Sequence, residues 1–89
     1  MPRYFFHVDD GGGHKDSEGM ELGGLDAARE HAVSYFGELL RDSARIFWND
    51  RDWQMTVTDA SGLVYFTLHF VATVAAAGTA IDRDNVRCR

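Results

Sequence analysis

Apolar and polar residues alternate with a period of two in three stretches of the chain. The first stretch is residues 2–9, and the others are residues 53–58 and 64–70. Alternation of this kind places one set of side chains on each face of a sheet. Between the last two stretches, Asp59-Ala60-Ser61-Gly62 has Asp in the first position and Gly in the fourth, as type I turns often do. The sequence therefore predicts one early strand and one later β-hairpin.

Between these stretches the period changes to that of a helix. From Leu25 onward apolar residues recur at spacings of three and four, and Asp26 and Arg41 suit the two ends of a helix dipole. We predict a helix over about residues 25–43 and a short strand at residues 20–22. The apolar stripe consists of Leu25, Ala28, Ala32, Phe36, Leu39 and Leu40.

This order of elements predicts an α+β fold of the type β-(β)-α-β-β. A three- to four-stranded, mainly antiparallel sheet would have one helix packed on one face. Residues 1–71 would form a single domain, and residues 72–89 would be a short helix, a docking arm or a frayed tail. If the strand–helix–strand connection is right-handed, the last strand lies between the first and the middle strand, and the short strand lies beside the first. Phe47 and Trp48 are expected to close one end.

The alternation also sorts the side chains of the sheet. The layer facing the helix is expected to contain Tyr4, Phe6, Val8, Met55, Val57, Phe66 and Leu68. The opposite face would carry Arg3, Phe5, His7, Gln54, Thr56, Thr58, Tyr65, Thr67 and His69. The sequence offers no second helix for that face, which would stay open unless the tail folds over it. A face that is partly apolar and able to form hydrogen bonds favours association with copies of itself.

Composition argues against several classes of function. The formal net charge is −5 and the basic residues are scattered, which disfavours nucleic-acid binding. The opening residues form too short an apolar run for a signal peptide, and Cys88 is a lone thiol, which favours a cytoplasmic protein. The stretch from Leu63 to Ile81 has no charged residue, but its first half alternates as a strand does, so no membrane segment is predicted.

The motifs that suggest chemistry are incomplete. The triple glycine at residues 11–13 lacks the Lys-Ser/Thr ending of a phosphate loop, and the acidic residues around it do not have the spacing of a calcium loop. His7 and His69 could face each other, but a stable zinc site needs three or four ligands, and no third is obvious on that face, although His14 could reach it from the loop. Cys88 and the serines have no partner base in sequence. We therefore predict no catalytic residues, no cofactor and no metal.

Several segments together resemble a family of short, uncharacterised bacterial proteins, a domain of unknown function. The segments are Pro2-Arg3-Tyr4-Phe5-Phe6-His7, Asp16-Ser17-Glu18-Gly19-Met20-Glu21-Leu22, Leu25-Asp26-Ala27-Ala28, Trp53-Gln54-Met55-Thr56-Val57-Thr58-Asp59 and Gly62-Leu63-Val64-Tyr65-Phe66-Thr67-Leu68. The resemblance covers about residues 1–71, and the triple glycine and the tail depart from it. It implies no activity and no site residues.

These observations favour a non-enzymatic module that self-associates as a homodimer through the open sheet face or a sheet edge. The candidate interface residues are Phe5, His7, Thr56, Tyr65, Thr67 and His69. The alternative is a regulatory protein that binds another protein, as some bacterial antitoxins do, by analogy of fold only. A metal-binding protein or an enzyme is less favoured.

Overall fold

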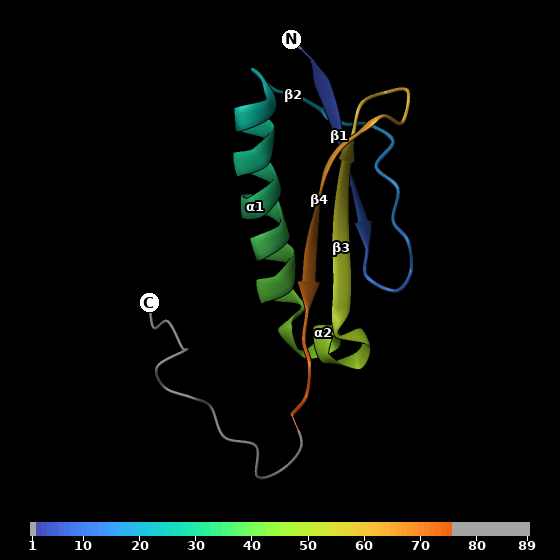
Figure 1. Ribbon diagram of the computed structural model, residues 1–89, viewed down its shortest axis with the longest axis vertical. Coiled ribbons are helices and arrows are strands. Elements are labelled where there is room, and N and C mark those ends of the chain that lie inside the picture. Colours follow the sequence, from blue (N-terminus) through green and yellow to red (C-terminus); the bar gives the residue numbers. More distant parts are fainter. Residues whose placement is uncertain (1, 76–89) are drawn as a thin grey trace.

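The computed structural model describes residues 2–75 and contains a four-stranded antiparallel sheet with helices on one side (Figure 1). The α+β fold predicted from the sequence is confirmed. Residues 76–89, which include most of the predicted arm, lie outside the described residues. The elements are β1 (Arg3–Asp9), β2 (Met20–Glu21), α1 (Leu25–Asp42), α2 (Ala44–Asp50), β3 (Asp52–Thr58) and β4 (Val64–Val71).

The core lies between α1 and one face of the sheet. Every second residue of β1 and β3 is buried, and Met55 and Val57 at its centre are inaccessible to solvent. Burying side chains of this size stabilises the fold by about 1.5–3 kcal/mol each. The buried hydrophobic residues are Tyr4, Phe6, Val8, Ala28, Ala32, Phe36, Phe47, Trp53, Met55 and Val57, and Phe66 and Leu68 pack against them. The layer predicted to face the helix is thus confirmed.

The predicted main helix is α1, which ends one residue before the predicted boundary. Its buried stripe is Ala28, Ala32 and Phe36. The two alanines bring the backbone of α1 close to the sheet, while Phe36 fills the space further along. Gly24 precedes the helix, and the Ser43 N–H donates to the Leu39 carbonyl oxygen at the other end.

A second short helix, α2, was not predicted, because the charged segment after Trp48 suggested an irregular connection. Ser43 leaves helical geometry, and Arg51 then turns the chain with a left-handed φ of 60°. Between them Phe47 is buried, and its ring contacts the rings of Trp53 and Phe70 edge-on, with centroids 5.7 and 5.1 Å apart. Phe47 therefore closes this end as expected, whereas Trp48 is 57% exposed.

The predicted strand order was wrong: the sheet runs β2-β1-β3-β4, so the last strand is at an edge and not in the middle. The prediction assumed that the helix returns the chain to the start of the first strand. Instead the loop before β2 makes that return, so α1 runs in the same direction as β1 and β3 runs opposite to it (Figure 1). The short strand does pair with the first, as expected.

The pairing of β3 with β4 is regular except at one bulge. Val57 pairs with Phe66, but the next residue, Thr58, pairs with Val64, so Tyr65 is an extra residue on β4. A bulge interrupts the alternation of side chains between faces. The Tyr65 ring accordingly contacts the ring of Tyr4, a core residue, with centroids 5.3 Å apart. Simple alternation had assigned Tyr65 to the open face.

Candidate functional site

The glycine-rich loop between β1 and β2 runs along the outer edge of β1. His14 exchanges two backbone hydrogen bonds with Val8, of 2.9 and 2.7 Å. Further along, the Asp16 carboxylate accepts a hydrogen bond of 3.1 Å from the Phe6 N–H. The loop and β2 thus satisfy backbone groups that the edge of β1 would otherwise expose.

Asp16 organises this loop. Its Oδ2 accepts from the Phe6 N–H, and its Oδ1 accepts from the N–H groups of Glu18 and Gly19, each at 3.1 Å. Burial alone would raise the pKa of the Asp16 carboxyl, but these three backbone hydrogen bonds outweigh burial and lower it. Asp16 is therefore a structural carboxylate that is held ionised.

The imidazole of His7 is fixed between the loop and β3. The Asp16 N–H donates to His7 Nδ1 at 3.1 Å, so the ring proton lies on Nε2, which donates to the Thr58 hydroxyl at 3.0 Å. That hydroxyl in turn donates to the Asp59 carbonyl oxygen at 3.1 Å. Both ring nitrogens of His7 are occupied by contacts within the chain.

The pairing of His7 with His69 that a zinc site would need is not seen. His69 lies on β4, where its Nε2 is 2.5 Å from Asp52 Oδ1. Among residues 2–75 no three His, Cys, Asp or Glu side chains gather as a metal site would require.

The sheet face opposite α1 is less open than predicted, because the loop leans over its β1 side. Phe5 and His7 are half-buried, and Thr58 is only 6% exposed. A hollow of about 560 Å³ opens beside these three residues, between the loop and the β3–β4 turn. Of the other predicted interface residues, Thr56 is half-buried, whereas Tyr65, Thr67 and His69 are exposed. The exposed members are therefore all on β4.

The outer edge of β4 has no partner strand among the described residues. Val8 directs its N–H away from β3 toward His14, and alternate residues of an antiparallel ladder point to opposite sides. Following this alternation through β3 leaves the backbone groups of Thr67, His69 and Val71 directed outward from the sheet. Exposed apolar side chains follow the same strand: Val64, Tyr65, Phe70 and Val71 are all at least 41% exposed.

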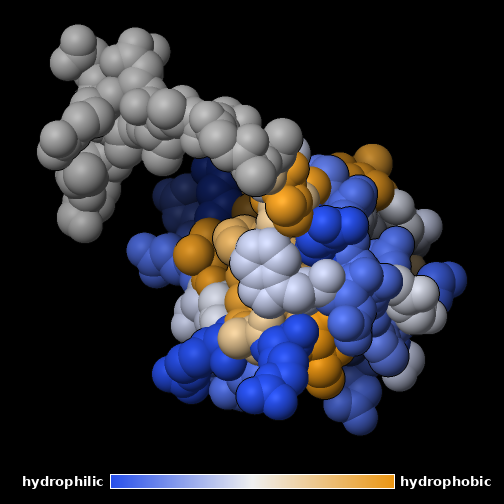
Figure 2. Space-filling model, turned by 90° about the horizontal axis from the view of Figure 1, so that it is seen from below, coloured by the Kyte–Doolittle hydropathy of each residue, from blue (hydrophilic) through white to orange (hydrophobic). Residues whose placement is uncertain are grey.

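Two apolar hollows adjoin this edge. A groove of about 280 Å³ separates β4 from α1, with Val33, Gly37 and Leu40 on the helix side and Leu68 and Phe70 on the strand side. A second hollow, of about 410 Å³, lies at the end of the molecule between α2 and the end of β4, and includes Trp48. Figure 2 shows hydrophobic atoms gathered on this end.

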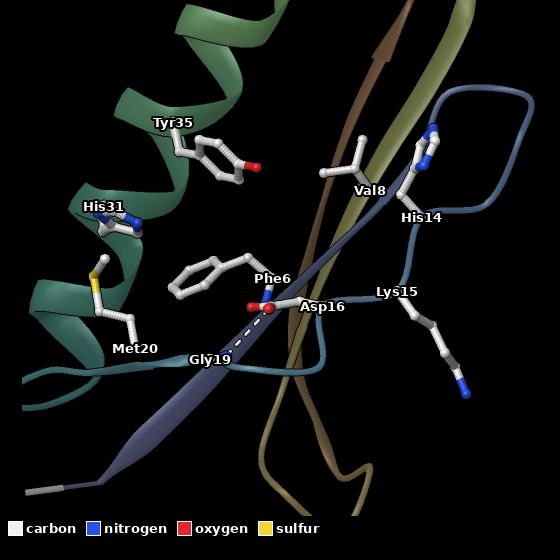
Figure 3. Close-up of a pocket in the computed structure, with 9 residues that line it drawn as sticks. All are labelled: Phe6, Val8, His14, Lys15, Asp16, Gly19, Met20, His31 and Tyr35. Atoms are coloured by element: carbon white, nitrogen blue, oxygen red, sulfur yellow. Dashed lines mark hydrogen bonds between the residues drawn. The ribbon is translucent and has the colours of Figure 1, made fainter.

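Another hollow, of about 480 Å³, lies on the same face of the sheet as this groove but toward the opposite edge, between α1 and β1 (Figure 3). Its floor is Phe6 and Val8, and one wall is formed by the rings of His31 and Tyr35 on α1, which stack 6.0 Å apart. Asp16 faces this wall from the loop, whereas the Lys15 side chain points away.

The sequence identified the exposed residues of β4 but missed the surface that they form with α1. Val33 was outside the apolar stripe of the helix, yet it is 62% exposed beside the β4 edge. An exposed β-branched residue one helical turn before Gly37 was the available signal. This signal could be interpreted only once the structure had shown that β4 is the edge strand.

Comparison with known proteins gives a family but no function. No curated protein and no solved structure matches the chain. No helix among residues 2–75 is both long and apolar enough to cross a membrane. One family model matches residues 3–71, which include every strand and helix described above. The chain therefore belongs to the family described as Domain of unknown function (DUF6894).

Proposed function

We propose that this domain is a non-enzymatic interaction module that self-associates as a homodimer. The observation that carries the proposal is the edge of β4: eight residues without Asp, Glu, Lys, Arg or Pro, and with outward-directed backbone groups. Soluble proteins usually protect such edges with charges, proline or a covering segment. An unprotected apolar edge favours the addition of another strand.

The geometry around the histidines supports a role without catalysis. A general base needs a ring nitrogen free to reach substrate, and both nitrogens of His7 are engaged within the chain. His69 is bound to Asp52 on the exposed side of the hairpin and lines only the shallow groove beside β4. A binding role requires only the surface itself.

The proposal places the protein in the cytoplasm of a bacterium. Its single cysteine cannot form a disulfide within the chain, which suits a reducing compartment. The opening motif Pro2-Arg3-Tyr4-Phe5-Phe6-His7, which resembles that of bacterial sequences, supports the proposed bacterial origin.

Sedimentation velocity over a wide range of concentrations tests self-association. The chain has a mass of 10.0 kDa, and we expect the weight-average mass to rise toward twice that value between about 1 µM and 1 mM. A mass that stays at that of one chain throughout this range would refute the homodimer.

Binding to a different protein is the second candidate, favoured by the hollow between α1 and β1. Its stacked His31 and Tyr35 rings and the facing Asp16 offer aromatic and polar contacts at one place. Affinity purification from the native host should then recover a partner with the wild-type protein but not with Tyr35→Ala. Equal recovery with both proteins would exclude this hollow as the binding site.

A further inference from the structure

We propose that β4 pairs antiparallel with β4 of a second copy about a twofold axis at Leu68, which joins two sheets into one of eight strands. This pairing rests on the self-association proposed above and specifies its geometry. Two identical strands related by a twofold axis perpendicular to the sheet run antiparallel, and each then presents the same surface to the other.

The direction of the backbone groups fits an axis at Leu68. Leu68 pairs with Met55 and directs its own backbone groups toward β3, whereas its neighbours Thr67 and His69 direct theirs outward. With the axis at Leu68, Thr67 of one copy lies opposite His69 of the other, and the two residues exchange backbone hydrogen bonds. The two Leu68 residues then face each other as a pair without hydrogen bonds.

The same register brings complementary side chains together. Phe66 of one copy lies opposite Phe70 of the other, on the face of the sheet toward α1. Aromatic pairs across neighbouring strands stabilise a sheet. Phe70 is 47% exposed in the single chain and would be covered by this contact.

The groove beside α1 receives the partner strand. A strand added to β4 places its helix-facing side chains directly below Val33, Gly37 and Leu40. Val33 is 62% exposed. Gly37 has no side chain, and a Cβ atom built on Gly37 would meet no atom within 4 Å. The groove therefore has both the apolar lining and the space that the Phe66 and Leu68 side chains of a second copy need.

Charge favours this edge over the rest of the surface. Each chain carries a net charge of −5, so two copies repel each other over most orientations. The segment Val64–Val71 has no Asp, Glu, Lys or Arg, and its histidine, His69, is already paired with Asp52. Contact through β4 therefore brings the two copies together where repulsion is weakest.

The area available fits a dimer of moderate strength. About an axis at Leu68, the seven residues Tyr65–Val71 pair and span about 24 Å, and a sheet layer with a helix layer is about 20 Å thick. The product is about 480 Å² for each copy, or about 960 Å² in total, close to the ~1,000 Å² expected of a specific interface. We therefore expect dissociation in the micromolar range, where the wild-type protein can be studied on both sides of the equilibrium.

Two matched helix substitutions test the interface. Val33→Lys and Ile46→Lys each replace a β-branched residue that is 62% or 60% exposed, on α1 and α2 respectively. Only the first lies in the groove beside β4. Sedimentation velocity should show at least a tenfold weaker dimer for Val33→Lys and an unchanged dimer for Ile46→Lys. Circular dichroism checks that both variants are folded.

Disulfide trapping tests the register. In a Cys88→Ser background, Leu68→Cys places two thiols at the axis, where opposite Cα atoms are about 4.5 Å apart and a disulfide can form. The control Val64→Cys lies four residues from the axis, so its two copies are about 27 Å apart and cannot be linked. Non-reducing gels should show a covalent dimer for Leu68→Cys alone.

The outcomes separate this pairing from self-association itself. A wild-type protein that remains monomeric refutes both. A wild-type dimer that is unaffected by Val33→Lys and is not trapped by Leu68→Cys refutes the β4 pairing and leaves self-association standing. Trapping through Val64→Cys instead of Leu68→Cys would overturn the proposed register.

Discussion

Two glycines of the β1–β2 loop have nearly the same φ but different surroundings. Gly13 has a φ of +69° and open space around it, whereas Gly19 has a φ of +72° and lies against β1. A Cβ on Gly19 would be 2.9 Å from Phe5 Cε2 and 3.0 Å from the Tyr4 carbonyl oxygen. The loop therefore needs Gly19 for close approach as well as for its left-handed conformation.

Alanine at each of these glycines separates the two effects. Gly13→Ala should cost about 1–2 kcal/mol for the left-handed conformation alone. Gly19→Ala should cost at least about 1 kcal/mol more, because the loop must also move away from β1. Urea unfolding of both variants measures the difference. Equal losses of stability would mean that the loop does not pack on β1 as described.

Asp16 should contribute more to the stability of the fold than its exposed neighbour Glu18. Asp16→Asn and Glu18→Gln each remove one negative charge from the same loop, but only the first disturbs a side chain that accepts three backbone hydrogen bonds. We expect a loss of about 1–3 kcal/mol for Asp16→Asn and nearly none for Glu18→Gln. Urea midpoints at neutral pH give the comparison. Similar urea midpoints for both variants would mean that Asp16 stabilises the fold no more than an ordinary surface charge does.

The same carboxylate predicts how stability depends on pH. The folded pKa of Asp16 lies below its ordinary value of 3.8, so its contribution is complete above that value and is lost as the pH falls through the folded pKa. Asp59, whose pKa is lowered first of all by the Ser61 hydroxyl, acts in the same direction. The free energy of unfolding should therefore fall below about pH 4, and less steeply in Asp16→Asn. Parallel curves for the two proteins would contradict this assignment.

At the scale of elements, the contribution of α2 to the core is the burial of one aromatic ring. Phe47 is 4% exposed, whereas its neighbour Trp48 is 57% exposed. Phe47→Ala should therefore destabilise the domain by about 3–5 kcal/mol, enough to unfold much of a protein this small, and Trp48→Ala by far less. Thermal unfolding followed by circular dichroism distinguishes them. A larger effect at Trp48 would mean that this end of the core is packed differently.

The faces of the strands were predictable from the sequence, but their neighbours were not. Alternation placed Tyr4, Phe6 and Met55 in the core because side-chain direction is a local property of a strand. The order of strands depends on which segment returns the chain to the start of β1, and hydrogen bonds to Asp16 hold that returning loop in place. Periodicity does not contain this information.

The candidate site was predictable to a similar degree. Thr67 and His69 are exposed as expected, since they lie on the strand that ended up at the edge. Phe5 and His7 are half-buried because the loop leans over them, and Tyr65 contacts the core because a bulge interrupts the alternation. Both departures come from contacts between segments that are distant in the sequence. The exposure of these side chains depends on such contacts, which the local alternation of residues does not reveal.

At the scale of the whole molecule, dimerisation and folding should be linked. A domain of this size has a small core and a stability of only about 5 kcal/mol, so covering the β4 edge adds an appreciable share of the total. If β4 pairs with a second copy, the folded dimer is favoured by mass action, and its Tm depends on protein concentration.

The size of this dependence follows from the entropy of unfolding. At about 2.1 cal/mol/K per residue, two copies of the domain unfold with about 0.3 kcal/mol/K, and a tenfold increase in concentration contributes about 1.4 kcal/mol to the dimer. Above the dissociation constant, Tm should therefore rise by about 5 °C for each tenfold increase in concentration. Calorimetry of the wild type and of Val33→Lys provides the comparison, because the variant keeps the fold but loses the groove contact. A wild-type Tm that does not change with concentration would show that the edge of β4 adds nothing to the stability of the folded chain.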